Sequence, residues 1–124
     1  MAARILVVDD EPAVLGVVSK ALAIRGYETH AASSPARALE MATAAHFDLV
    51  VSDVIMPEMC GPELVRRIAQ IRPTTAVLLM SGQIAAEALP TRAAFIGKPF
   101  LMKDLYLAVE KALTPNPARP LADG

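Results

Sequence analysis

The sequence ILVVDDEP, residues 5–12, places four apolar residues directly before three acidic ones. An aliphatic and β-branched run of this kind is typical of a strand that is buried on both faces of a sheet. Charged groups inside a protein are costly unless they are paired or used. The question is therefore why a buried strand leads straight into a cluster of negative charge.

The rest of the chain repeats the same unit. Short apolar or β-branched runs alternate with longer segments of helical periodicity, which predicts βαβ units and a parallel sheet covered by helices on both faces. The predicted strands cover residues 4–8, 28–32, 48–52, 76–80 and 93–96. Helical spacing predicts core-facing sets in the third and last helices: Leu64, Val65, Ile68 and Ile71, then Leu101, Leu105, Ala108, Val109 and Ala112.

Turn and cap residues separate these elements. Pro12 suits the first turn of a helix and Gly26 the position just past its end, while Ser34 with Pro35 opens the next helix. The segment 83–92 has room for one or two helical turns, so we expect a shortened fourth helix. We expect one domain over residues 1–113 and a disordered, proline-rich tail over residues 114–124.

The composition excludes several classes of function. Twelve Lys and Arg residues nearly balance thirteen Asp and Glu residues, and neither sign forms a long run, so the sequence predicts no nucleic-acid or membrane partner. The single cysteine, Cys60, rules out an internal disulfide. No apolar stretch approaches the length that spans a bilayer, and we expect a cytoplasmic protein.

Acidic residues follow two of the predicted strands. In a doubly wound parallel sheet of order 2-1-3-4-5, ligands bind at the carboxyl ends of the strands, near the point where the strand order reverses. Asp9 and Asp10 follow strand 1, and Asp53 follows the neighbouring strand 3. Three converging carboxylates repel one another unless a cation lies among them, and oxygen ligands without histidine favour Mg²⁺. This answers the question that residues 5–12 raise.

The other strand ends add complementary groups. Ser81 follows strand 4 and Lys98 follows strand 5. A metal, an ammonium and a hydroxyl around one carboxylate can neutralise a phosphoryl group in transfer. With Asp53 as nucleophile, the product would be an aspartyl phosphate.

Four motifs, each at a predicted strand end, then identify a family. They are VVDDE (7–11), SDVIMPEMCG (52–61), MSG (80–82) and AFIGKPF (94–100). Over residues 4–113 the chain resembles the response-regulator receiver domains of two-component signalling, both free-standing ones and those attached to hybrid sensor kinases. The resemblance implies a flavodoxin-like (βα)5 fold.

The resemblance also implies a role for each matching residue. Asp53 is similar to the phosphoacceptor, Asp10 and Asp53 to the direct Mg²⁺ ligands, Asp9 to the acid that holds a metal-bound water, and Ile55 to the residue whose carbonyl is the third ligand. Three further residues complete the set: Lys98 would pair with a phosphate oxygen, Ser81 would move to bond another, and Pro99 would hold the loop through a cis bond.

The implied partners are proteins. The donor would be a phosphohistidine on a sensor histidine kinase or a histidine phosphotransfer protein, and the output a conformational signal to a downstream protein target. The domain would catalyse its own phosphorylation and dephosphorylation without being an enzyme for a separate substrate. We expect a monomer or a weak dimer.

Several points stay open at this stage. Phe95 matches the aromatic switch of the family, or it is a plain core residue of its strand. Ile55 is apolar where many relatives carry a polar side chain, which predicts slow dephosphorylation. For Cys60 a neutral filler before Gly61 is favoured over a redox sensor, and for His30 and His46 a structural or solvated role is favoured over a metal-binding or acid-base one.

Two other functions compete with the phosphorylated receiver. The first is a receiver-like protein-interaction module that is never phosphorylated, although such a module has no need of a costly carboxylate cluster. The second is a phosphatase with an aspartate nucleophile, or a flavin or dinucleotide binder on the same fold. A second acid two residues after Asp53 and a phosphate-binding loop after strand 1 would support it, and the sequence has neither.

Overall fold

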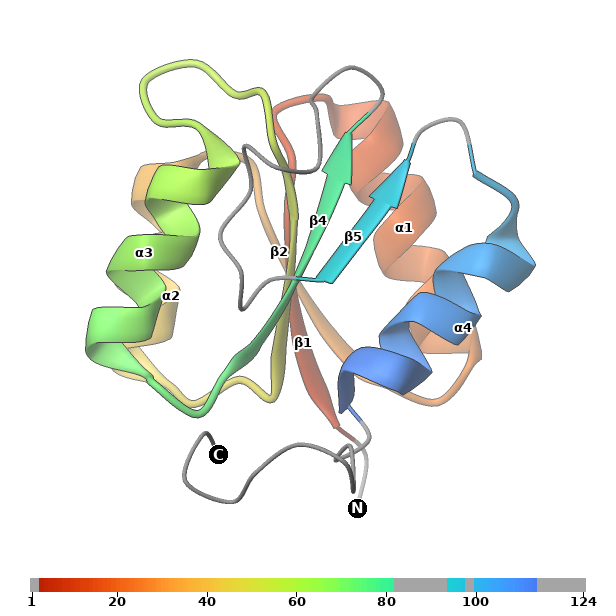
Figure 1. Cartoon of the computed structure of the whole chain (residues 1–124). Helices are drawn as coiled ribbons and strands as arrows, with labels where there is room; N and C mark the ends of the chain where they lie inside the picture. Colours follow the sequence, from red (N-terminus) through yellow and green to blue (C-terminus); the bar gives the residue numbers. More distant parts are fainter. Residues whose placement is uncertain (1–2, 82–93, 98–99, 114–124) are drawn as a thin grey trace.

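The computed structural model describes residues 3–81, 94–97 and 100–113. Its five strands form one parallel sheet in the order β2-β1-β3-β4-β5, as the sequence predicts (Figure 1). The strands are β1 (Arg4–Val8), β2 (Glu28–Ala32), β3 (Leu49–Asp53), β4 (Ala76–Ser81) and β5 (Ala94–Gly97). The predicted bounds of β1 and β2 are confirmed to the residue, and those of the other three differ by one.

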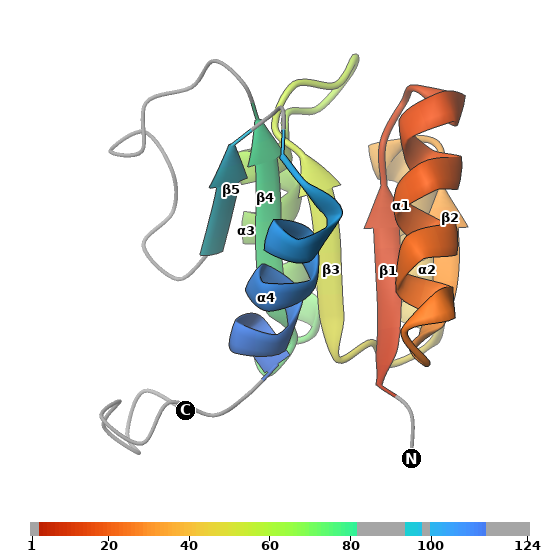
Figure 2. The same ribbon diagram turned by 90° about the vertical axis from the view of Figure 1, so that its right-hand side faces the viewer.

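Four helices are present in the described part of the chain: α1 (Pro12–Ile24), α2 (Pro35–Ala44), α3 (Gly61–Ile71) and α4 (Met102–Leu113). Helices α1 and α4 cover one face of the sheet, and α2 and α3 cover the other (Figure 2). The predicted short fourth helix within 83–92 and the predicted tail 114–124 lie outside the described residues. None of the described helices is long and apolar enough to cross a membrane.

The helix ends use the predicted cap residues. Pro12 begins α1, and past its end Gly26 has a φ of 96°, a left-handed conformation that glycine adopts without strain. The Ser34 side chain caps α2 by accepting a hydrogen bond from the backbone N–H of Arg37 at 3.1 Å. These caps fix where each helix leaves the sheet.

Alternate side chains of each strand point to opposite faces, so the sheet separates two cores. On the α1/α4 side the buried residues are Ile5, Val7, Val18, Leu22, Leu49, Val51, Leu78, Met80, Ile96, Leu105 and Val109. On the α2/α3 side, beside a smaller cluster of Val54, Val65, Val77 and Leu79, they are Leu6, Val8, Ala32, Ala38, Ala42, Phe47, Val50, Met56, Leu64 and Ile68. We call these the α1/α4 core and the α2/α3 core.

Two predicted core positions are wrong. Leu101 is 61% exposed, because α4 begins only at Met102 and Leu101 precedes the helix. Ile71, the last residue of α3, is also exposed. Both errors fall at a helix terminus, where the chain turns away from the sheet.

Candidate functional site

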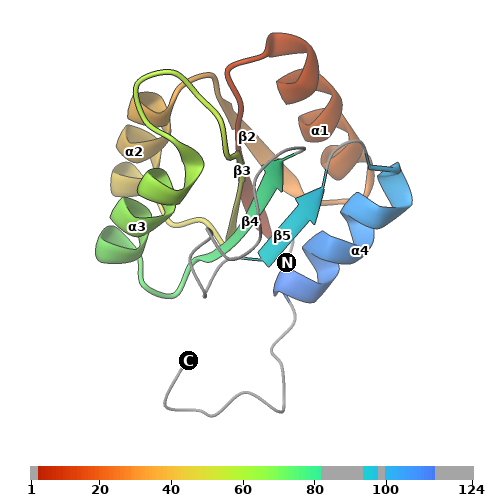
Figure 3. The ribbon, with the colours of Figure 1, turned by 45° about the horizontal axis from the view of Figure 1, so that its top comes forward.

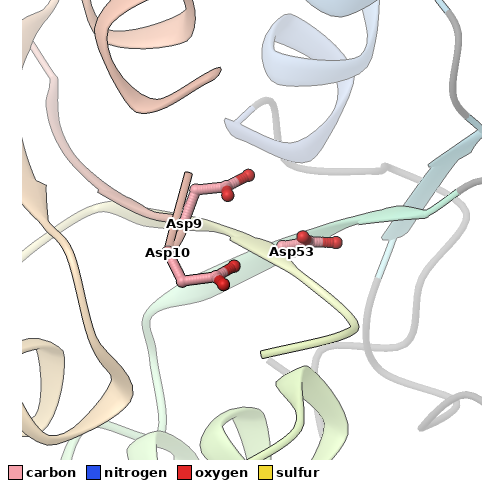
Figure 4. Close-up of side chains that lie close together, drawn as sticks. All are labelled: Asp9, Asp10 and Asp53. Carbon is pink, nitrogen blue, oxygen red and sulfur yellow. The ribbon is translucent and has the colours of Figure 1, made fainter. Parts of the chain in front are cut away.

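The three predicted carboxylates meet at one edge of the sheet. Asp9 and Asp10 follow β1, while Asp53 is the last residue of β3, and the two strands are neighbours with Val8 paired to Ser52. One ligand oxygen from each of the three acids lies within 4.8 Å of the others. Figure 3 brings the carboxyl ends of the strands forward, and Figure 4 shows the three side chains gathered there. The parallel topology produces this convergence.

The three acids differ in their exposure to water. Asp9 is 0% exposed and Asp53 is 8% exposed, whereas Asp10 is exposed. Carboxylates this close repel one another, and burial strengthens the repulsion. A hard divalent cation fits the donor set, because all three ligands are carboxylate oxygens and the exposed side leaves room for water and phosphate oxygens.

Two hydrogen bonds fix Asp9, one to the neighbouring strand β2 and one within its own loop. The backbone N–H of Asp9 donates to the carbonyl of Ala32 at 3.2 Å, which continues the β1–β2 pairing by one residue. Its Oδ1 accepts a hydrogen bond from the backbone N–H of Glu11 at 2.9 Å. This side-chain turn leads the backbone from the strand into α1.

Asp53 is held by the end of the sheet. It pairs in register with Met80, and the N–H of the next residue, Val54, donates to the carbonyl of Met80 at 3.0 Å. The hydroxyl of buried Ser52 donates to the carbonyl of Asp53 at 2.9 Å. The N–H of Ile55 points toward the Asp53 carboxylate, with a distance of 3.4 Å to Oδ1. The backbone on both sides of Asp53 is therefore fixed.

Ile55 and Phe95 lie at the surface. Ile55, two residues after Asp53, exposes most of its side chain. Phe95 is 38% exposed on β5, while the next residue, Ile96, is buried in the α1/α4 core. The alternative that Phe95 is a plain core residue is therefore wrong.

The remaining predicted site residues are described only in part. Ser81 is the last residue of β4, where its backbone pairs with Gly97 of β5, and its side chain lies outside the described part of the structure. Lys98 and Pro99 also lie outside the described residues. Their roles stay predictions.

The two histidines interact with acids near the amino ends of the strands, away from the carboxylate cluster. His30 Nε2 lies 2.8 Å from Glu28 Oε2, and His46 Nε2 lies 3.5 Å from Asp48 Oδ1. The hydrogen bonds from His30 and from Arg4 lower the pKa of the Glu28 carboxyl below its ordinary value. Both contacts fit the structural or solvated role expected for the histidines.

Sequence reasoning alone does not identify two residues that contact the Asp53 peptide, Ser52 and Gly61, as site residues. The hydroxyl of Ser52 braces the Asp53 peptide, and Gly61 brings the first turn of α3 against the same peptide. The signal for Gly61 was its place at the end of the motif SDVIMPEMCG, where only a turn was expected. A serine inside a buried strand gave no signal at all.

Comparisons with known proteins agree with this geometry. The family model for the response regulator receiver domain matches residues 5–110. The response regulator receiver protein CpdR of Brucella abortus is 35% identical over 89% of this chain and 96% of its own length. The sensor kinase CckA of the same organism is 40% identical over 90% of this chain and 12% of its own length.

Solved structures share the fold. The chemotaxis protein CheY4 of Vibrio cholerae superposes with a TM-score of 0.84 and 30% sequence identity, over 91% of this chain and 100% of that one. Several curated relatives are much longer, and the chain spans only 12–25% of their length. The family match, the sheet order and the carboxylate cluster together show that this chain belongs to the response regulator receiver domain family.

Proposed function

We propose that this receiver domain accepts a phosphoryl group on Asp53 from a phosphohistidine of a sensor histidine kinase or a histidine phosphotransfer protein. The observation that carries the proposal is the position of Asp53 at the last residue of β3, with the carboxylates of Asp9 and Asp10 beside it. The end of a buried strand holds this carboxylate in place before a phosphodonor arrives, and such preorganisation is what phosphoryl transfer requires of a protein.

The proposed transfer exchanges one bond to phosphorus for another. A carboxylate oxygen of Asp53 attacks phosphorus, the P–N bond to the donor imidazole breaks, and the leaving imidazole nitrogen takes up a proton. A Mg²⁺ ion held by Asp10, Asp53 and the carbonyl of Ile55, with Asp9 on one of its waters, would offset the negative charge of the phosphoryl group. Hydrolysis of the acyl phosphate later returns the carboxylate.

The groups at the ends of β4 and β5 complete the proposed mechanism. Lys98 follows β5 and would pair with a phosphoryl oxygen, and Ser81 at the end of β4 would bond another. Phe95 lies at the surface of β5, two strands from Asp53, and would change its position when Ser81 moves. Pro99 would hold the loop that carries the lysine. The output would be a changed surface for a downstream protein target.

A small P–N donor tests the proposal directly. The whole chain is incubated with phosphoramidate and Mg²⁺, and its intact mass is followed beside the variants Asp53→Asn and Glu40→Gln. Glu40 is an exposed carboxylate on α2 that pairs with Arg37, so it controls for the loss of a surface charge. We expect one added phosphoryl group on the wild type and on Glu40→Gln, and none on Asp53→Asn or in excess EDTA. An unmodified wild-type chain would favour the unphosphorylated interaction module.

A further inference from the structure

The loop over residues 54–60 joins the phosphoaccepting strand β3 to α3 and borders the carboxylate cluster. Two methionines fasten it to the protein interior: Met56 is buried in the α2/α3 core, and Met59 packs against the same core. Just before Met56, Ile55 stays exposed, two residues after Asp53. The two methionines therefore anchor the loop to the core, while its second residue, Ile55, lies at the carboxylate cluster.

The tip of this loop is a tight and strained turn. The N–H of Met59 donates to the carbonyl of Pro57 at 2.8 Å, which closes a three-residue turn around Glu58. Glu58 has a φ of 73°, a left-handed conformation that is unfavourable for a residue with a side chain. Strained residues persist where the surrounding structure fixes them. Something beyond the tip must therefore hold the loop closed.

Gly61 closes the loop at its far end. Its N–H donates to the carbonyl of Val54 at 2.7 Å, so the first residue of α3 is bonded to the residue after Asp53. A Cβ atom at this glycine would overlap the carbonyl oxygen of Asp53 and would lie 2.9 Å from Cα of Val54. Both neighbours are backbone atoms and cannot rotate aside. Glycine is needed here for space, because the two backbones touch.

We propose that Gly61 is a positioning residue for the phosphoacceptor, and this inference rests on the proposed function of Asp53. Any side chain at Gly61 forces α3 or the loop away from the end of β3. This movement lengthens the hydrogen bond from the Gly61 N–H to the Val54 carbonyl. Ile55, whose N–H faces Asp53 Oδ1, lies in the same loop and moves with it. A displacement of this kind at a reacting group can lower a rate by about 10–100-fold.

The chain contains a matched control for this substitution. Gly16 lies in the interior of α1 on its exposed face, and a Cβ atom there meets nothing within 4 Å. Alanine favours the helix more than glycine does, so Gly16→Ala adds a methyl group without displacing any neighbour. The two variants make the same chemical change at one crowded and one open position.

Three measurements compare Gly61→Ala, Gly16→Ala and the wild type well below their melting temperatures. Metal-free ¹H–¹⁵N spectra report the Ile55 amide, a Mg²⁺ titration gives the dissociation constant for the metal alone, and acetyl phosphate with intact mass gives the phosphorylation rate. In Gly61→Ala we expect a native far-UV spectrum, a shifted Ile55 amide, Mg²⁺ binding weakened about tenfold and a phosphorylation rate lowered at least tenfold. Gly16→Ala should match the wild type in all three.

A second variant separates the backbone contact from side-chain crowding. The third neighbour of the added Cβ atom is Cδ2 of Leu79, at 3.0 Å, and Gly61→Ala with Leu79→Val shortens that side chain. We expect the double variant to keep the Mg²⁺ and phosphorylation defects, because the backbone overlap remains. Recovery of wild-type values would contradict the inference.

The other outcomes are equally decisive. One outcome is that Gly61→Ala lowers stability and still leaves Mg²⁺ binding and phosphorylation at wild-type values. That outcome would show a merely structural role for Gly61 and would overturn the inference. The proposed function of Asp53 would stand. The same would follow if Gly61→Ala stayed unfolded even in the Gly16→Ala background, since the inference confines the damage to the loop. A wild type that takes up no phosphate would overturn the proposed function, while the Ile55 amide and Mg²⁺ titration would still test Gly61.

Discussion

Asp10 is the exposed member of a cluster whose other two carboxylates are buried. This asymmetry gives a cation and a phosphodonor a way in, and it means that one negative charge can be removed without leaving a gap in the interior. Asp9, by contrast, is tied to the backbone at Ala32 and Glu11. Asp9 therefore holds the local backbone in addition to its proposed role at the metal, whereas for Asp10 the chemical role alone is proposed.

The substitution Asp10→Asn should have opposite effects with and without Mg²⁺. Removal of one of three mutually repelling carboxylates should raise the metal-free free energy of unfolding by about 1 kcal/mol. Loss of a ligand should weaken Mg²⁺ binding by about tenfold or more. Urea unfolding with EDTA and with saturating Mg²⁺ measures both effects. A metal-free protein that becomes less stable would show that the Asp10 carboxylate is paired and does not repel its neighbours.

Ile55 should set the lifetime of the phosphorylated form. Its exposed apolar side chain cannot orient a water molecule for attack on the acyl phosphate, so hydrolysis should be slow. Ile55→Gln should shorten the lifetime several-fold, with Ile55→Leu as the apolar control. The loss of the phosphoryl group is followed by intact mass after the donor is removed. A wild-type lifetime under a few seconds at neutral pH with Mg²⁺ would contradict this prediction.

At the scale of elements, the connection between β3 and α3 brings the strand end, the turn and the helix start together. The strand ends at Asp53, the turn passes through Glu58, and the helix begins at Gly61 (Figure 1). Buried Met56, partly buried Met59 and the hydrogen bond between Gly61 and Val54 hold the turn against its own strain. The connection is therefore held firmly at Met56, Met59 and Gly61 and is strained at Glu58.

The strain at Glu58 can be measured by a substitution. Glycine adopts a φ of 73° without strain, which stabilises the folded state, but it also loses more conformational entropy on folding. Because the relief of strain is the larger effect, Glu58→Gly should raise the free energy of unfolding by about 0.5–1 kcal/mol. Glu58→Ala keeps the Cβ atom and serves as the control, for which we expect no gain. Equilibrium urea unfolding compares the three proteins. A gain of equal size in Glu58→Ala would assign the effect to the lost charge.

The sequence could predict the elements, but not the contacts between their ends. Short apolar and β-branched runs place the strands within a residue, because burial on both faces leaves a clear apolar run, as in residues 5–8. Strand β3 extends to Asp53 because of the pairing with Met80, a long-range hydrogen-bonding feature that no local pattern contains. Leu101 fits the helical period and still lies outside α4. The crowding at Gly61 depends on three segments and cannot be read from any one of them.

At the scale of the molecule, the strand order explains why distant acids meet. β1 and β3 are paired neighbours although α1, β2 and α2 separate them in sequence, so Asp10 and Asp53 converge at the ends of two adjacent strands. Three carboxylates could be predicted to meet from the sheet topology alone. Their unequal burial could not, because it depends on how the loops pack over the strand ends.

Mg²⁺ should stabilise the whole fold by mass action. A ligand that binds only the folded state at one hundred times its dissociation constant adds about 2.7 kcal/mol to the free energy of unfolding. The urea midpoint should therefore rise with Mg²⁺ and return on addition of EDTA, and the rise should be much smaller in Asp53→Asn. Glu40→Gln should rise as the wild type does. Equal rises in Asp53→Asn and the wild type would place the metal elsewhere.

If the phosphoryl group resides on Asp53, chemical reduction can locate it there. An acyl phosphate reacts with borohydride and leaves homoserine in place of the aspartate, whereas an unmodified carboxylate does not react. The wild-type chain is phosphorylated with acetyl phosphate and Mg²⁺, reduced, digested and sequenced by mass spectrometry. We predict homoserine at position 53 and unchanged aspartate at positions 9 and 10. Homoserine at another acid, or at none, would contradict phosphorylation of Asp53.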